Sequence, residues 1–398
     1  MQKNQLITLE ITDLARGGAG VGRFENQVVF VSFTAPGDRV EAEVMKVSKS
    51  YVNAELRKIL VPSPQRVEPK CAVFGRCGGC EWQHLPYSLQ WQTKTRGVKE
   101  ALKRALKFAG QDPALVESLP FDELPADVIW NYRNRIQLRG LRNEIGYFTR
   151  ASNDLIAIDE CPIARRELNE TLSETRAEGA ALKTPYKVEV EVLENRDVRK
   201  SWNEKHAAQG FRQVHDEQNQ KLRQWVGRAI QNRNATILDL YGGAGNLATA
   251  ALEFAPNPAE IHCVDSHAGD PKHHVKPGKP GNPENSRNLE KIWFHRLPVA
   301  RWIQKALLTR DLMANSLTVI VDPPREGLGQ DLENIADAAE KWGATEWIAV
   351  GCDADSWAKD VTQMIARGWK LDKIGALDFF PQTAHVEALA RLTKAAKA

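Results

Sequence analysis

The chain has 398 residues, of which 42% are hydrophobic and 26% charged, and its formal net charge is +3. These values are typical of a globular protein of two or three domains and exclude a disordered or collagen-like chain. No apolar run reaches the roughly 18 residues of a membrane span, and the N-terminus lacks the apolar core of a signal peptide. We therefore expect a cytoplasmic protein with reduced cysteines and no membrane partner.

Residues 1–62 are predicted to form a small β-barrel. Hydrophobic and charged residues alternate from Arg39 to Val44, which is the period of a half-buried strand. Another apolar strand, Gln27–Phe33, follows a glycine-rich turn at residues 17–22. Short strands separated by frequent turns are typical of barrels, and the proline-rich residues 61–64 indicate a linker to the next domain.

Four of the six cysteines indicate a metal or cluster site in a central domain, residues 63–210. Cys71, Cys77 and Cys80 have C-x5-C-x2-C spacing, and Cys161 stands directly before a proline. Three clustered thiolates and a distant fourth are typical of iron–sulfur ligation. Zinc is the alternative, because C-x2-C pairs also bind zinc.

The rest of the central domain is predicted to combine a long helix with a β-hairpin, as an α+β domain. Within residues 87–108, Val98, Leu102 and Leu106 form an apolar stripe. The basic residues around the stripe are expected to face solvent, and they are Lys94, Arg96, Lys99, Lys103, Arg104 and Lys107. Alternating residues between 136 and 148 predict the hairpin.

Residues 211–398 are predicted to form a doubly wound, Rossmann-like α/β domain, because apolar strands alternate there with helical segments. The strands are expected at residues 235–240, 260–265, 317–322 and 346–351. The segment His267–Pro283 is rich in Gly, Pro, His and Lys and is interpreted as a surface loop. Its pair His273–His274 could bind a metal, but the composition favours a solvated loop.

Acidic and glycine-rich loops of this domain point to a ligand site. Asp239-Leu-Tyr-Gly-Gly-Ala-Gly-Asn246 joins a strand to an apolar helix, and its glycines let the backbone approach a ligand closely. An ordinary glycine-rich turn is the alternative, since the segment has neither G-x-G-x-x-G nor the Walker lysine. Asp265 ends the next strand, and Asp322-Pro-Pro-Arg325 follows a later one. Ligands of such sheets bind beyond the carboxyl ends of strands, where we expect these acids.

Two residues near the C-terminus complete a resemblance to a known family. Cys352 directly follows a strand, and Glu387 ends the segment Phe380-Pro-Gln-Thr-Ala-His-Val-Glu387. With the motifs at 71–84, 130–135, 211–213 and 322–327, they resemble the bacterial RNA uracil-5-methyltransferases of the iron–sulfur type, which make 5-methyluridine in large-subunit ribosomal RNA. The resemblance covers nearly the whole chain. It implies that the barrel is a TRAM domain, an OB-like RNA-binding module.

The resemblance also implies a reaction. A thiolate at Cys352 would attack C6 of uracil, which makes C5 nucleophilic, and Glu387 would later remove the C5 proton. S-adenosylmethionine would donate the methyl group, and the target uridine would leave its stack. The implied partner is structured RNA, foremost 23S rRNA, and no DNA partner is expected.

The binding residues are likewise implied by the resemblance. Those for S-adenosylmethionine are Gln213, Tyr241, Gly243, Gly245, Asn246, Asp265 and Asp322. Those for a [4Fe–4S] cluster are Cys71, Cys77, Cys80 and Cys161.

The chain departs from the family at several positions. The nucleophile stands in Gly351-Cys-Asp-Ala354, where the family has Ser-Cys-Asn-Pro, so Asp353 is expected to raise the thiol pKa if it lies close. Residues 294–298 replace an expected Gly-Asp, and Asn285 and Asn288 are the remaining candidates for paired asparagines. Two alternatives stay open: a transfer-RNA uracil methyltransferase, and a catalytically inactive RNA-binding paralogue.

Overall fold

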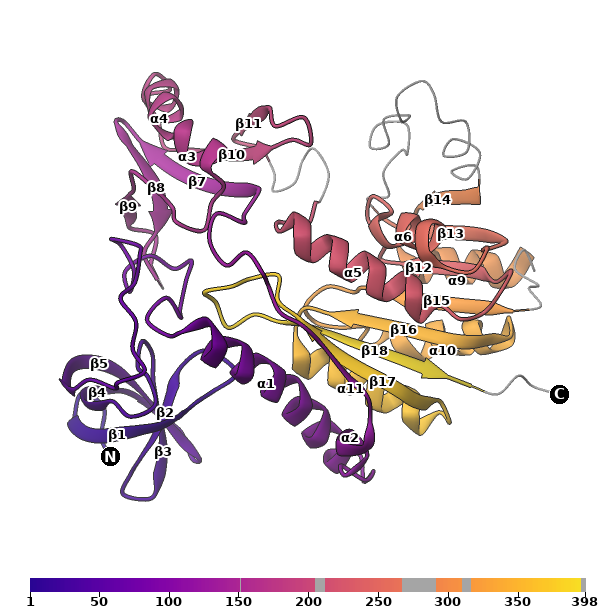
Figure 1. Cartoon of the computed structure of the whole chain (residues 1–398), viewed down its shortest axis with the longest axis horizontal. Coiled ribbons are helices and arrows are strands. Elements are labelled where there is room, and N and C mark those ends of the chain that lie inside the picture. Colours follow the sequence, from indigo (N-terminus) through magenta and orange to yellow (C-terminus); the bar gives the residue numbers. More distant parts are fainter. Residues whose placement is uncertain (151, 205–211, 267–290, 310–315, 395–398) are drawn as a thin grey trace.

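The computed structural model describes residues 1–150, 152–204, 212–266, 291–309 and 316–394. In Figure 1 the small central sheet lies above the barrel on the left, and the large C-terminal sheet lies on the right. Some predictions from the sequence lie outside the described residues. They concern the loop at 267–283 with its histidine pair, the asparagines at 285 and 288, and residue 211.

The N-terminal residues form a closed five-stranded barrel, as the alternating pattern predicted. Its strands are β1 (Leu6–Leu14), β2 (Gly20–Phe24), β3 (Gln27–Val31), β4 (Arg39–Val47) and β5 (Tyr51–Val61). They are ordered β1-β2-β3-β5-β4, so closure leaves no unpaired edge strand. Val40, Ala42 and Val44 are fully buried and belong to the barrel's hydrophobic core.

The central sheet carries two short helices packed against it. Its strands are β7 (Arg135–Leu141), β8 (Glu144–Phe148), β9 (Leu155–Ala157), β10 (Tyr186–Val192) and β11 (Val198–Trp202), in the order β11-β10-β7-β8-β9. The helices are α3 (Arg166–Glu170) and α4 (Leu172–Ala180), and their residues Leu168 and Leu172 join the core under the sheet. The antiparallel pairing of β7 with β8 confirms the predicted hairpin.

The C-terminal sheet has eight strands and confirms the predicted doubly wound α/β architecture. In spatial order they are β14 (Ile292–Arg296), β13 (Glu260–Asp265), β12 (Thr236–Leu240), β15 (Leu317–Val321), β16 (Ala344–Gly351), β18 (Glu387–Thr393), β17 (Lys370–Leu377) and β6 (Phe121–Leu124). The five strands from β14 to β16 are parallel, whereas β18 is antiparallel to both of its neighbours. The order reverses between β12 and β15, which is where sheets of this kind bind ligands.

Helices cover both faces of this sheet. One face carries α5 (Asp216–Ala229) and α6 (Asn246–Phe254), and the other carries α1 (Tyr87–Phe108), α9 (Val299–Thr309), α10 (Asp331–Lys341) and α11 (Ala354–Ala366). The short α2 (Leu115–Ser118) lies between α1 and β6. The predicted stripe of Val98, Leu102 and Leu106 on α1 is fully buried. No helix among the described residues is both long and apolar enough to cross a membrane.

Helix α1 and strand β6 lie within the segment predicted as the central domain, yet they complete the C-terminal sheet. β6 pairs in parallel with β17, where Phe121 lies opposite Ile374, and α1 lies beside α11 (Figure 1). The expectation that Lys94 faces solvent is wrong. Its side chain is fully buried, and its Nζ lies 2.7 Å from Oδ1 of Asp378. The domain limits at residues 62 and 210 stay a prediction.

Candidate active site and cysteine cavity

Cys352 and Glu387 stand next to each other at the ends of two neighbouring strands. Gly351, the last residue of β16, pairs with Ala388 of β18 in an antiparallel ladder. One step further along this ladder, the chain reaches Cys352 on one side and Glu387 on the other. Cys352 is half-buried, and Glu387 is only 5% exposed. The ladder therefore brings together two predicted catalytic residues that are distant in sequence.

Two carboxylates and one guanidinium surround the thiol. Burial, together with Glu387 and Asp322, raises the pKa of Cys352 to about 12, and Arg325 partly opposes this rise. Burial and Asp322 raise the pKa of Glu387 to about 8, again against Arg325. Burial raises the pKa of Asp322 to about 6. Arg325 had no predicted role, and its place in the Asp-Pro-Pro-Arg motif was the only signal for it.

Asp353 has a different task from the one predicted. Its carboxylate accepts hydrogen bonds from the main-chain N–H groups of Asp355 and Ser356, both at 3.0 Å, and so caps the N-terminus of α11. The largest charge effects on the pKa of Cys352 come from Glu387 and Asp322 instead. Asp353 thus serves as the N-cap of α11.

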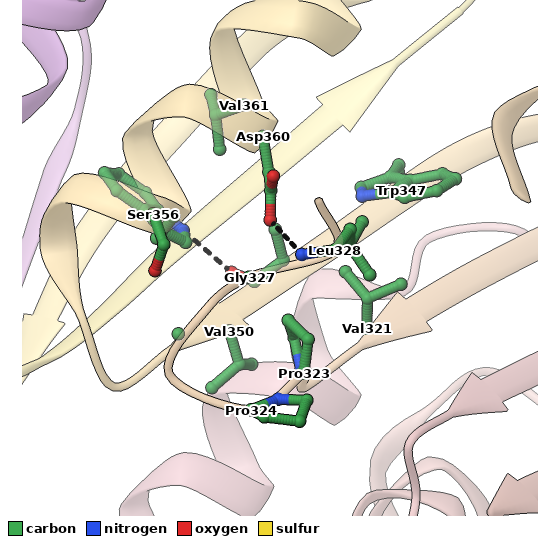
Figure 2. A pocket seen from close by; sticks show the side chains of 13 residues that line it. Val321, Pro323, Pro324, Gly327, Leu328, Trp347, Val350, Ser356, Asp360 and Val361 are labelled. Carbon is green, nitrogen blue, oxygen red and sulfur yellow. Dashed lines mark hydrogen bonds between the residues drawn. The ribbon is translucent and has the colours of Figure 1, made fainter. Parts of the chain in front are cut away.

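The loop after β15 is held in place by α11. The main-chain N–H of Leu328 donates to Oδ2 of Asp360 at 2.7 Å (Figure 2). Gly327 has a φ of +76°, and a Cβ added there would lie 2.7 Å from the same carboxylate oxygen, so glycine is required. Oγ of Ser356 donates to the carbonyl oxygen of Arg325 at 2.8 Å. Asp322, which begins this loop, is therefore held in a fixed direction.

The glycine-rich turn after β12 leaves its backbone open to a ligand. Tyr241, Gly243 and Gly245 have φ values of +63°, +54° and +86°, all in the left-handed region. The main-chain N–H of Gly243 donates to Oδ2 of Asp265 at 3.3 Å. A Cβ added to Gly243 would meet no atom within 4 Å. An accessible main chain thus lies beside a carboxylate at the carboxyl ends of β12 and β13.

Three acids gather at this edge of the sheet. Burial raises the pKa of Asp239 to about 7, and the charges of Asp322 and Asp265 add to this rise. Asp239 is fully buried, and its Oδ2 accepts a hydrogen bond from the main-chain N–H of Ala248 at 2.8 Å, which fixes the start of α6. The acids predicted from the ends of β12, β13 and β15 are thus close enough to influence one another.

The remaining predicted cofactor residues contact other parts of the protein. The side-chain amides of Asn246 and Asn219 exchange two hydrogen bonds of 2.8 and 3.1 Å between α6 and α5. The Tyr241 hydroxyl donates to Oδ2 of Asp331 at 3.3 Å. Gln213 lies shortly before α5, where its carbonyl oxygen accepts a hydrogen bond from Asn134.

All four predicted cluster ligands line one cavity of about 250 Å³. Cys71, Cys77 and Cys80 come from the irregular segment before α1, and Cys161 follows β9. Burial raises the pKa of the first three thiols, that of Cys80 to about 12, and the charge of Cys161 adds to each rise. Within the described ranges, no three His, Cys, Asp or Glu side chains are grouped so that they could hold a metal ion.

Cations lie over aromatic rings near the barrel and the central sheet. The Arg150 guanidinium lies 5.2 Å from the ring centre of Phe33, a barrel residue. Arg139 lies 5.5 Å from the ring of Phe148, and Nζ of Lys70 lies 4.9 Å from that of Trp130. The sequence alone gave no signal for these pairs, because each one forms only when the chain has folded.

Comparison with known proteins agrees with this architecture. The model of the TRAM domain matches residues 2–56, which form most of the barrel. An uncharacterised RNA methyltransferase of Bdellovibrio bacteriovorus is 31% identical, over 97% of this chain and 94% of its own. The 23S rRNA (uracil(1939)-C(5))-methyltransferase of Pectobacterium atrosepticum is 27% identical, over 96% of this chain and 93% of its own.

A solved structure shares the fold over nearly the full length. It is the tRNA (uracil-54, C5)-methyltransferase of Pyrococcus abyssi, in complex with S-adenosyl-L-homocysteine. The TM-score is 0.67 at 21% sequence identity, and the match covers 97% of this chain and 100% of that one.

Proposed function

We propose that this chain, which belongs to the RNA methyltransferase family, transfers a methyl group from S-adenosylmethionine to C5 of a uridine in RNA, foremost in 23S rRNA. The proposal rests above all on the thiol of Cys352 and the carboxyl group of Glu387, which the ladder of β16 and β18 brings together. C5 of uracil is a poor nucleophile, and a thiolate that adds to C6 turns C5 into an enolate carbon. A base beside the thiol is then needed for the C5 proton.

The two residues would act in turn on one ring. The Cys352 thiolate adds to C6, and C5 takes the methyl group. Glu387 then removes the proton from C5. The electron pair of that C–H bond forms the C5–C6 double bond again, and the C6–S bond breaks to return the thiolate. Because a duplex hides C6, the uridine must leave its stack first.

The charges of the site govern when the thiol reacts. In the protein alone, a thiol pKa of about 12 keeps Cys352 protonated at neutral pH, and a pKa of about 8 keeps most of Glu387 protonated. S-adenosylmethionine would supply the methyl group as a sulfonium, whose positive charge favours the ionised forms of both groups. Arg325 acts in the same direction. We therefore expect the thiolate to form in the assembled complex.

We place the methyl donor beyond the carboxyl ends of β12, β13 and β15. Gly243 offers an open main chain there, and Asp265 is suited to accept hydrogen bonds from ribose hydroxyls. Asp322 follows β15, which lies between β12 and β16 in the sheet, so this acid stands between the crevice and the thiol. The contacts of Gln213, Tyr241, Gly245 and Asn246 with the donor remain predictions.

The four cysteines are proposed to hold a [4Fe–4S] cluster. Zinc is the alternative, because C-x2-C pairs also bind zinc. A four-iron cluster takes one thiolate on each iron and so suits thiols spread around a cavity of about 250 Å³. Its role would be structural, because methyl transfer moves no unpaired electron.

Structured RNA is the proposed partner. The family resemblance seen in the sequence implies that the barrel binds RNA. Unstacked bases pack on aromatic rings and guanidinium planes, and Phe33 and Arg150 provide one of each. The relative from Pectobacterium atrosepticum acts on 23S rRNA, which makes this RNA the first candidate and the cytoplasm the expected compartment. Transfer RNA is second, because the protein that shares the fold acts on tRNA.

The proposal is tested by incubating the purified protein with methyl-labelled S-adenosylmethionine and either 23S rRNA or total tRNA. Mapping of the modified nucleosides should then find labelled 5-methyluridine in 23S rRNA. Label confined to tRNA would establish the second candidate. Binding of RNA without any methyl transfer would overturn the proposal in favour of an inactive RNA-binding protein.

A further inference from the structure

The nine residues that lead into Glu387 form an unusually well-anchored connection. This segment, Asp378–Val386, joins β17 to β18 and is called the base loop here. Most of its side chains are buried, including Phe379, Gln382 and Thr383. A surface connection between two antiparallel strands would normally be exposed and mobile. The base loop is instead enclosed by the segments around it.

The start of the base loop is tied to α1 by a buried ion pair. Nζ of Lys94 lies 2.7 Å from Oδ1 of Asp378 and donates to the carbonyl oxygen of Phe380 at 3.0 Å. The Tyr87 hydroxyl donates to the other oxygen of Asp378, also at 3.0 Å. Both charged side chains are fully buried. Burial of such a pair is costly unless further hydrogen bonds complete it, as they do here.

Gln382 joins the middle of the base loop to two other segments. Its main-chain N–H donates to Oε1 of Gln90 at 2.9 Å, and its own Oε1 accepts from Nε2 of Gln90 at 3.0 Å. Its carbonyl oxygen accepts from the main-chain N–H groups of Glu81 and Trp82, at 3.2 and 3.0 Å, directly after Cys80. Gln382 is 2% exposed and has a φ of +72°, a strained conformation for a residue other than glycine.

Gln90 completes the network from α1. It is fully buried, and its Nε2 also approaches the carbonyl oxygens of Trp82 and Leu85, at 3.1 and 2.9 Å. One glutamine side chain therefore links α1, the cysteine-bearing segment and the base loop. A satisfied buried network of this kind enforces a single conformation of the groups that it joins.

On the basis of the proposed function, we propose that Gln382 and Gln90 are positioning residues that aim Glu387 at the C5 proton of the methylated adduct. Glu387 begins β18, so the ladder holds the chain only on its C-terminal side. The main chain on its N-terminal side arrives from the base loop, five residues after Gln382. The direction of the Glu387 side chain thus depends on both the ladder and the base loop.

Among the described residues, none of the hydrogen bonds of Gln90 and Gln382 reaches the nucleophile. Cys352 lies between β16 and the capped start of α11. Weakening the Gln382–Gln90 network should therefore leave C6 attack and methyl transfer intact and slow only the removal of the C5 proton. Because that removal must precede breakage of the C6–S bond, the methylated RNA should stay covalently bound to Cys352.

The test is a single-turnover reaction of the full-length protein with 23S rRNA and methyl-labelled S-adenosylmethionine, quenched in denaturant. Label in a denaturation-resistant protein–RNA adduct is measured beside label in free 5-methyluridine. In Gln90→Met we expect normal first-turnover methyl transfer, an accumulated adduct and product release slowed about 10- to 100-fold. The matched control is Gln111→Met. Nε2 of Gln111 donates to the Thr362 carbonyl oxygen, away from the base loop, so release should be unchanged.

A second variant distinguishes a loss of positioning from a folding defect. Gln382→Met keeps the main-chain hydrogen bonds and loses only the side-chain contact, so it should trap the adduct to a smaller extent. The proposal is overturned if both variants release product at the wild-type rate, or if they lose methyl transfer without any adduct. Glu387→Gln separates the proposed function from the positioning role of Gln90 and Gln382. It removes the base itself, so it should trap the adduct even if the two glutamines have no positioning role. If it traps none and the wild type makes no 5-methyluridine, the proposed function falls as well.

Discussion

The cysteine cavity and the active site both contain buried thiols, yet their surroundings differ. The pKa of Cys80 and that of Cys352 are each raised to about 12, and burial is the largest cause at both. At Cys80 the next charges that raise it are those of other thiols, Cys161 and Cys77. At Cys352 they are the carboxylates of Glu387 and Asp322. The neighbours, rather than the pKa, thus separate a candidate ligand from a candidate nucleophile.

The two regions are also built differently. The thiols of the cavity come from irregular segments before α1 and after β9, outside the named strands. Cys352 and Glu387 extend from paired strands, so the hydrogen-bond ladder of β16 and β18 fixes the main chain beside both. We therefore expect loss of a cavity thiol to disturb structure, and loss of a strand-end group to disturb chemistry.

Removal of the nucleophile should have the largest effect. Cys352→Ala should abolish both 5-methyluridine and the covalent RNA adduct, because the other five cysteines, all among the described residues, lie in β13 or line the cysteine cavity. The matched control is Cys263→Ala, which removes a fully buried thiol of β13 and should leave adduct formation in place. A denaturing gel with labelled RNA reads out both variants. Persistence of the adduct in Cys352→Ala would contradict the assignment of the nucleophile.

Removal of the base should be next in size and should change the pH dependence. Glu387 acts only as a carboxylate, and its pKa is about 8. Below that pH, the rate of product release from the methylated adduct should fall about tenfold per unit, and above it the rate should level off. Glu387→Gln should slow product release about 10²- to 10⁴-fold and remove this rise. A wild-type profile that is flat between pH 6 and 9 would exclude this role for Glu387.

Loss of a cavity thiol should act on metal content and stability. Cys80→Ser should lower bound iron and the midpoint of thermal unfolding, because the cluster stabilises the folded state that binds it. Cys352→Ala serves as the control and should keep its iron. Elemental analysis with calorimetry measures both quantities. Zinc in place of iron in protein purified without oxygen would contradict the proposed cluster.

Loss of the nearby cation should have the smallest effect. Arg325 lowers the pKa of both Glu387 and Cys352. Arg325→Met should therefore move the midpoint of the pH–rate profile upward, by about one unit or less because the side chain is exposed. Arg228→Met, on the exposed side of α5, is the control and should leave the midpoint in place. A downward shift in Arg325→Met would show that another charge dominates the site.

The sequence predicted those parts of the fold in which apolar residues recur with a clear period. The barrel, the hairpin and the parallel strands all repeat apolar residues over several positions. β6 could not be predicted, because Phe121–Leu124 is too short for a period and takes its place by pairing with β17, about 250 residues later. The burial of Lys94 was missed for a similar reason, since its counter-charge, Asp378, is far away in the chain.

The sequence predicted the site residues that stand in a motif. It missed the residues whose role arises only from packing between distant segments. Cys352 and Glu387 stand in recognisable segments, and the strand ladder brings them together. Asp353 was expected to raise the thiol pKa because it is next to Cys352 in sequence. In the structure its side chain instead accepts hydrogen bonds at the N-terminus of α11. Gln90 and Gln382 had no sequence signal, because ordinary polar residues become anchors only when three segments meet around them.

The antiparallel pairing of β16 with β18 makes the spacing of thiol and carboxyl group independent of how much chain lies between them. From α11 to the middle of β17, insertions, deletions and drift in sequence leave both groups in place as long as the register survives. A slip of one residue would turn every side chain of one strand to the opposite face. Variants that differ in length over this stretch alone can therefore keep the thiol and the carboxyl group side by side.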